Sequence, residues 1–166
     1  FYANGQACIS VQRIVLEQPI AAEFEQALLA RLDEVTVGDP RSADTRVAPV
    51  INEASTQRIM GWIGSATARG AQVLAGGELS GGSIQPTVVT GVPADAELWC
   101  EEIFGPVVCL QTVPDVDAAI HLVNQSRYGL QAAVFTKSLE TAFRAVNELE
   151  VGGVVVNEIP GFRSDI

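Results

Sequence analysis

The stretch at residues 107–136, "VVCLQTVPDVDAAIHLVNQSRYGLQAAVFT", contains the alternation that decides the fold class. Its first seven residues are mostly apolar and predict a buried strand, and residues 130–136 predict a second strand. Between the two, apolar residues recur at the spacing of one helical face: Val116, Ala119, Ile120 and Val123. The stretch therefore predicts a strand, a helix and a strand in succession.

The residues that follow continue this alternation. "SLETAFRAVNEL" at residues 138–149 predicts a helix with Ser138 as its N-cap, and "GGVVVNE" at 152–158 predicts a last strand. Strands and helices that alternate at this spacing are typical of βαβ units, whose helices cover the faces of a sheet. We therefore expect an α/β fold, a three-layer αβα domain with a mainly parallel sheet.

The preceding residues fit the same domain. "ISVQRIVLEQ" at residues 9–18 predicts a strand, and Pro19 opens a predicted helix over 19–35. A second helix is predicted over 51–71, with these candidate core positions: Ile51, Ile59, Trp62, Ile63 and Ala66. "AGGELSGG" at 75–82 lacks the GxxxxGK[ST] pattern of a phosphate loop, so it indicates a hairpin turn between short strands.

Composition and charge exclude several classes of protein. The 166 residues are 48% hydrophobic and 18% charged, which is typical of a folded globular domain. With 20 acidic against 10 basic residues the net charge is −10, so we expect no nucleic-acid partner. No apolar run approaches the roughly 20 residues of a membrane-spanning helix, so we expect no membrane partner. Three cysteines without a CxxC pair predict neither a disulfide framework nor a metal site, and they favour the reducing cytoplasm.

Cys8, within "FYANGQACIS" at residues 1–10, is the candidate nucleophile. Gly5, Gln6 and Ala7 suggest a tight turn, and backbone N–H groups at such a turn would favour a thiolate and stabilise an oxyanion. Cys109 lies in an apolar run and is predicted to be core, while Cys100 precedes two acids that disfavour a thiolate. His121, the single histidine, lies off the apolar stripe of its helix, which argues against a Cys–His hydrolase.

"EEIFGP" at residues 101–106 is the second unusual stretch. Two adjacent acids before an apolar pair and Gly-Pro suit neither a helix nor a strand. One interpretation is a tight loop with exposed acids. The other is a binding loop, in which one acid accepts hydrogen bonds from a polyol such as a ribose while Phe104 packs on a flat ring. The residues alone leave both open.

Together the two motifs carry a family resemblance. "GQAC" at residues 5–8, followed about a hundred residues later by "EEIFGPV" at 101–107, resembles the aldehyde dehydrogenase superfamily. "YGLQAAVFT" at 128–136 and "GGVVVN" at 152–157 agree in order, and the family commonly has Gly where this chain has Ala48. The resemblance implies a catalytic-domain type of fold and an NAD(P)-dependent aldehyde dehydrogenase.

The resemblance also implies roles for three residues. Cys8 would attack the aldehyde to form a thiohemiacetal, which hydride transfer to NAD or NADP converts to a thioester that water hydrolyses. Glu102 matches the family's acid that binds the nicotinamide ribose, and Phe104 matches the residue that packs near the nicotinamide. A cysteine acyltransferase or hydrolase and a catalytically inactive structural relative are the alternatives.

The resemblance extends to domain organisation and substrate. It implies that residues 1–166 are a catalytic-domain fragment, inactive alone, with the cofactor-binding domain and the general base outside it, so NAD and NADP are not distinguished. "FRSD" at 162–165 resembles relatives that act on small hydroxy- or anion-bearing aldehydes. Phe162 and Arg163 are therefore candidate substrate-binding residues, although Arg163 could instead pair with Asp165. The family's quaternary structures imply a homodimer or homotetramer.

Overall fold

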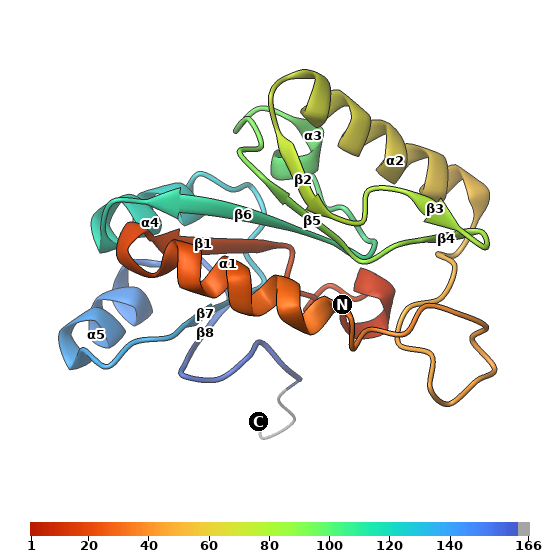
Figure 1. Cartoon of the computed structure of the whole chain (residues 1–166). Helices are drawn as coiled ribbons and strands as arrows, with labels where there is room; N and C mark the ends of the chain where they lie inside the picture. Colours follow the sequence, from red (N-terminus) through yellow and green to blue (C-terminus); the bar gives the residue numbers. More distant parts are fainter. Residues whose placement is uncertain (163–166) are drawn as a thin grey trace.

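The apolar run Val107–Val113 forms β6, an inner strand of the main sheet (Figure 1). The computed structural model describes residues 1–162. β6 pairs in parallel with β1 (Arg13–Glu17) on one edge and with β5 (Thr87–Thr90) on the other. β2 (Gln72–Ala75) adds an antiparallel strand beyond β5. The sheet is therefore mixed but mainly parallel, and most of β6 is buried because both faces are covered.

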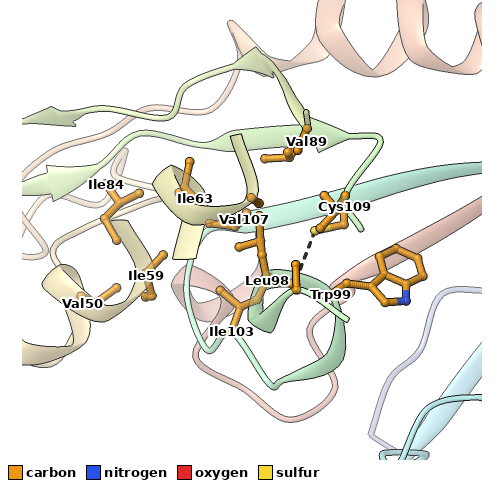
Figure 2. Close-up of a cluster of buried hydrophobic side chains, with 14 residues drawn as sticks. Val50, Ile59, Ile63, Ile84, Val89, Leu98, Trp99, Ile103, Val107 and Cys109 are labelled. Atoms are coloured by element: carbon orange, nitrogen blue, oxygen red, sulfur yellow. Dashed lines mark hydrogen bonds between the residues drawn. The ribbon is translucent and has the colours of Figure 1, made fainter. Parts of the chain in front are cut away.

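Helices cover the two faces of this sheet in separate layers. Val107 and Cys109 of β6 belong to a buried cluster that includes side chains of α2 (Glu53–Ala68) and α3 (Glu97–Cys100). Figure 2 shows this cluster, with the Cys109 thiol donating to the Leu98 carbonyl at 3.5 Å. Val108 and Leu110 belong to a second cluster, against which α1 (Gln18–Leu32) packs. This alternation along one strand confirms the predicted three-layer αβα arrangement.

The remaining elements lie around this sheet. A short 3₁₀ segment, η1 (Tyr2–Gly5), precedes β1. β3 (Leu79–Ser80) and β4 (Ser83–Ile84) form a hairpin whose turn is Gly81-Gly82, as predicted for the glycine-rich stretch. α4 (Val116–Asn124) packs against β1 and β6. No helix within residues 1–162 is long and apolar enough to cross a membrane.

The last strands form a sheet of their own. β7 (Gln131–Val134) and β8 (Gly153–Val156) pair in parallel and are joined through α5 (Leu139–Glu148), which Ser138 caps by accepting the Thr141 N–H at 3.1 Å. The predicted strands, helix and N-cap are thus confirmed, but these strands do not extend the main sheet. β7 and β8 pair only with each other, while β1 and β2 are the edge strands of the main sheet.

Most predicted core positions of α2 are confirmed. Ile59, Ile63 and Ala66 are buried, and Trp62 is half-buried beneath the Arg58 guanidinium, which lies 4.4 Å from its ring centre. Ile51 was expected in the core but is 81% exposed. The Asn52 side chain caps α2, so the helix begins at Glu53 and residue 51 lies outside its apolar face.

A pair of matched substitutions tests this core. Ile59 is 0% exposed, so Ile59→Ala should lower the free energy of unfolding by about 2–5 kcal/mol through lost burial and the cavity left behind. Ile51→Ala removes the same atoms from an exposed site and should change it by no more than about 0.5 kcal/mol. Urea denaturation measures both, and equal losses would contradict the placement of these residues.

Candidate active site

Two loops meet at one edge of the main sheet, and they contain the two unusual motifs. The cysteine loop, residues 5–12, leads into β1, and the acidic loop, residues 101–106, leads into β6. β1 and β6 are parallel neighbours, with Arg13 opposite Cys109. Segments that enter neighbouring parallel strands reach the sheet at the same edge. The topology therefore brings together two motifs that lie almost a hundred residues apart.

The two loops touch through their glycines. Gly5 has a φ of +73°, and a Cβ placed on it would lie 1.9 Å from the Gly105 carbonyl oxygen. A Cβ on Gly105 would in turn lie 2.5 Å from Cδ1 of the buried Ile59. Only glycine fits at position 5, where a Cβ would meet backbone at positive φ, whereas a Cβ at position 105 would require the Ile59 side chain to shift.

Cys8 lies exposed on a braced turn of the cysteine loop. The Ser10 N–H donates to the Ala7 carbonyl at 2.9 Å and closes the turn around Cys8. The Ser10 hydroxyl donates to the Tyr2 carbonyl at 2.7 Å, and the Gln6 side chain accepts the Ile51 N–H at 2.9 Å. The thiol is thus accessible to a small electrophile while the backbone beneath it is fixed.

The other two cysteines have different surroundings. Cys109 is fully buried, and burial raises the pKa of its thiol to about 12, which confirms it as a core residue. Cys100 is half-buried and lines a pocket of about 170 Å³ together with Arg13 and Trp99. Of the three cysteines, Cys8 alone is exposed.

The two adjacent acids of the acidic loop differ in their partners. The Glu101 carboxylate pairs with the Arg127 guanidinium and accepts the Tyr128 hydroxyl at 3.1 Å. Glu102 is exposed, and no group within residues 1–162 donates a hydrogen bond to its carboxylate. Of the two acids, Glu102 is the one available to a ligand.

Phe104 occupies an unusual backbone conformation beside Glu102. Its φ of +55° lies in the left-handed region, which costs a non-glycine residue about 1–2 kcal/mol. Its ring is 38% exposed although the neighbouring Ile103 and Gly105 are buried. Strained residues of this kind cluster at functional sites, and this one leaves an aromatic side chain partly exposed two residues after Glu102.

Comparison with known proteins agrees with this pairing of motifs. The sequence profile of the aldehyde dehydrogenase family matches residues 1–166. The chain belongs to the aldehyde dehydrogenase family. It is 38% identical over 162 residues to the chloroplastic betaine aldehyde dehydrogenase of Atriplex hortensis, covering 95% of this chain and 32% of that protein. It is 37% identical over 165 residues to the 3-sulfolactaldehyde dehydrogenase of Priestia aryabhattai, covering 99% and 35%.

Solved structures of the family superpose closely on the chain. Aldehyde dehydrogenase 21 from Physcomitrella patens, solved with the reaction product succinate, matches with a TM-score of 0.92 at 39% identity, covering 96% of this chain and 33% of that one. Betaine aldehyde dehydrogenase from Staphylococcus aureus, solved with NAD⁺, matches with a TM-score of 0.91 at 34% identity, covering 98% and 34%. The chain thus spans about a third of the length of these aldehyde dehydrogenases.

The remaining predicted residues of this aldehyde dehydrogenase chain lie near its C-terminal end or on α4. Phe162 is 86% exposed, next to Gly161, whose carbonyl accepts the Gln131 side chain at 3.0 Å. Arg163 and Asp165 lie outside the described residues. His121 is exposed on α4, as predicted, with a ring nitrogen 2.9 Å from the Gln125 side chain.

Sequence reasoning missed the residues that hold the acidic loop. Arg127 and Tyr128 pair with Glu101, and Gln12 bonds the loop backbone on both sides of Glu102. Gln12 is one of three polar residues, with Ser10 and Arg13, in the otherwise β-branched run "ISVQRIV" at residues 9–15, which is a weak signal at best.

The contact between the loops can be tested with two glycine substitutions. Gly5→Ala and Gly81→Ala both place a side chain at positive φ, which costs about 1–2 kcal/mol. At Gly81 no atom lies within 4 Å of the new Cβ, whereas at Gly5 the Cβ meets the Gly105 backbone. Gly5→Ala should therefore destabilise the protein by about 2 kcal/mol more than Gly81→Ala in urea denaturation. Equal effects would mean that the loops do not touch here.

Proposed function

We propose that this protein is an NAD(P)-dependent aldehyde dehydrogenase that oxidises a small aldehyde to a carboxylic acid through a thioester on Cys8. One observation carries the proposal: the exposed cysteine lies on a loop packed against the loop that presents Glu102 and Phe104. Membership of the aldehyde dehydrogenase family supports the same chemistry.

In this proposal Cys8 performs the covalent steps. Its thiolate attacks the aldehyde carbon, a C–S bond forms, and the carbonyl π electrons move to oxygen. Backbone N–H groups of the turn would stabilise that oxyanion. After the carbon loses a hydride and the carbonyl re-forms, the product is a thioester. Water then adds to the thioester carbon, the C–S bond breaks, and the acid and the thiol are released.

Glu102 and Phe104 are the residues of this chain that would hold the coenzyme. NAD⁺ or NADP⁺, when bound, supplies the acceptor for the hydride. An exposed carboxylate is a suitable acceptor for vicinal ribose hydroxyls, and the Glu102 carboxylate has no competing donor within residues 1–162. The exposed ring of Phe104 offers an apolar surface to a flat heterocycle. The relative solved with NAD⁺ supports this assignment.

We further infer that residues 1–166 form the catalytic domain of a longer enzyme, with the coenzyme-binding domain and the general base elsewhere. The chain spans about a third of its relatives' length, which supports this division. We expect the 166 residues alone not to turn over, and the full-length enzyme to be a cytoplasmic homodimer or homotetramer.

The nucleophile is tested by substituting one cysteine at a time in the full-length enzyme. Cys8→Ala should reduce aldehyde-dependent formation of NADH or NADPH by at least about a thousandfold, because no other group takes over the covalent steps. Cys100→Ala is the matched control and should retain activity. Absorbance of the reduced coenzyme and titration of the acid product measure both variants.

Three outcomes would contradict the proposal. Persistent coenzyme reduction by Cys8→Ala would remove Cys8 from the mechanism. Cys8-dependent acyl transfer or hydrolysis without coenzyme reduction would indicate a cysteine acyltransferase or hydrolase. A folded wild-type enzyme that reduces neither coenzyme with any aldehyde of a broad panel would be a catalytically inactive relative.

The substrate class follows from the tail of the chain. We expect Phe162 to form an apolar wall of the aldehyde site and Arg163 to bind a carboxylate, sulfonate or phosphonate group on the substrate. The relatives that act on 3-sulfolactaldehyde or bind succinate support an anionic substrate. Arg163→Ala should lower kcat/KM for anionic aldehydes by about 10- to 100-fold and leave uncharged aldehydes nearly unaffected. An unchanged preference between the two classes in steady-state kinetics would show that Arg163 serves another purpose.

A further inference from the structure

We propose that Gln12 is a positioning residue that aims Glu102, because its side-chain amide fixes the backbone on both sides of that acid. The Gln12 Nε2 donates to the Glu101 carbonyl at 2.6 Å, and its Oε1 accepts the Ile103 N–H at 2.8 Å. One rigid planar group thus spans residue 102. The inference rests on the proposed coenzyme-binding role of Glu102.

The backbone of Gln12 is itself fixed to the sheet. Its carbonyl accepts the Cys109 N–H at 2.8 Å, at the point where β1 begins to pair with β6. The Gln12 side-chain amide presents one donor and one acceptor, and both are used on the acidic loop, at Glu101 and Ile103.

The residues on either side of Glu102 are held by further groups. Ile103 is 1% exposed, and its carbonyl accepts the Arg58 Nη2 at 2.8 Å. The Glu101 N–H donates to the Glu97 carbonyl at 2.9 Å, while its carboxylate is occupied by Arg127. Glu102 is therefore an exposed residue between two fixed ones, and the plane of its backbone is set by Gln12.

This arrangement couples the two loops of the candidate site. Gln12 lies four residues after Cys8 on the same segment, so a single side chain relates the position of the thiol to that of the Glu102 carboxylate. Such a link matters because hydride transfer requires the aldehyde carbon, held by Cys8, and the nicotinamide to be aligned closely. A residue that only stabilised the fold would have no selective effect on coenzyme binding.

Two substitutions at residue 12, made in the full-length enzyme, distinguish the contributions of the two Gln12 side-chain hydrogen bonds. Gln12→Ala removes both bonds. Gln12→Glu keeps the size and the acceptor for the Ile103 N–H but replaces the donor with an oxygen that repels the Glu101 carbonyl. Gln57→Ala is the control, since that amide donates to Glu53 at 3.1 Å on the exposed surface of α2.

We expect both Gln12 variants to raise KM for the coenzyme about tenfold, with a smaller change in KM for the aldehyde, and Gln57→Ala to change neither. In a double-mutant cycle, Glu102→Gln should have a smaller effect in the Gln12→Ala background than in the wild type, because the acid is no longer aimed. An unchanged coenzyme KM, or a full effect of Glu102→Gln in both backgrounds, would overturn the inference.

A readout independent of activity distinguishes this inference from the proposed function. Amide hydrogen exchange of Ile103, whose N–H donates to Gln12, should accelerate about tenfold in Gln12→Ala and stay unchanged in Gln57→Ala, at equal global stability. If the wild type reduces no coenzyme but this exchange accelerates, the proposed function fails and the fixing of the loop by Gln12 stands. If exchange of the Ile103 amide is unchanged, Gln12 does not position Glu102, whatever the activity.

Discussion

The contact between the Gly5 and Gly105 backbones is the constraint on which the candidate site depends. A Cβ at Gly5 would lie 1.9 Å from the Gly105 carbonyl oxygen, so the two loops approach as closely as polypeptide backbones allow. Cys8 and Glu102 each lie three residues from this contact. Three residues span at most about 11 Å even when fully extended. The backbones of Cys8 and Glu102 are therefore each held within about 11 Å of this contact, and the parallel pairing of β1 with β6 supplies the frame.

The energetic cost of this approach is concentrated in the loops. Ala3, Asn4 and Phe104 all have positive φ, and a left-handed residue other than glycine costs about 1–2 kcal/mol. Nearby hydrogen bonds offset that cost: the Asn4 side chain accepts the Ala48 N–H at 2.9 Å, and Gln12 bonds the acidic loop. In the main sheet, no residue of the described strands has a positive φ. The backbone groups of these strands form ladder hydrogen bonds in the ordinary extended conformation. Rigid strands thus support a strained site, an arrangement typical of functional loops.

The sequence pattern correctly predicted the features that depend on residues close together in the chain. The helical periodicity of α4, the Ser138 cap and the burial of Cys109 follow from residues close in sequence, and all were confirmed. Pairing between strands joins residues far apart in the sequence, so periodicity did not reveal that β7 and β8 form a separate sheet. The bonds of Gln12 to the acidic loop join residues about ninety positions apart, and a single sequence carries no signal for a partner at that distance. The prediction for Ile51 was wrong because a capping residue, and not the apolar pattern, sets the start of α2.

The difference between the paired Glu101 and the exposed Glu102 also has an electrostatic basis. Two neighbouring carboxylates repel each other, and in a chain with a net charge of −10 a third anion would gain nothing from the overall field. Arg127 changes the local balance: its hydrogen bond to Tyr128 and its attraction to Glu101 raise its pKa, so it stays charged and neutralises that acid. Screening at physiological salt limits exposed charges to a range of about 8 Å, so the pairs at the loop outweigh the distant surface acids. Within the acidic loop the paired Glu101 is neutralised locally, and Glu102 remains the exposed carboxylate.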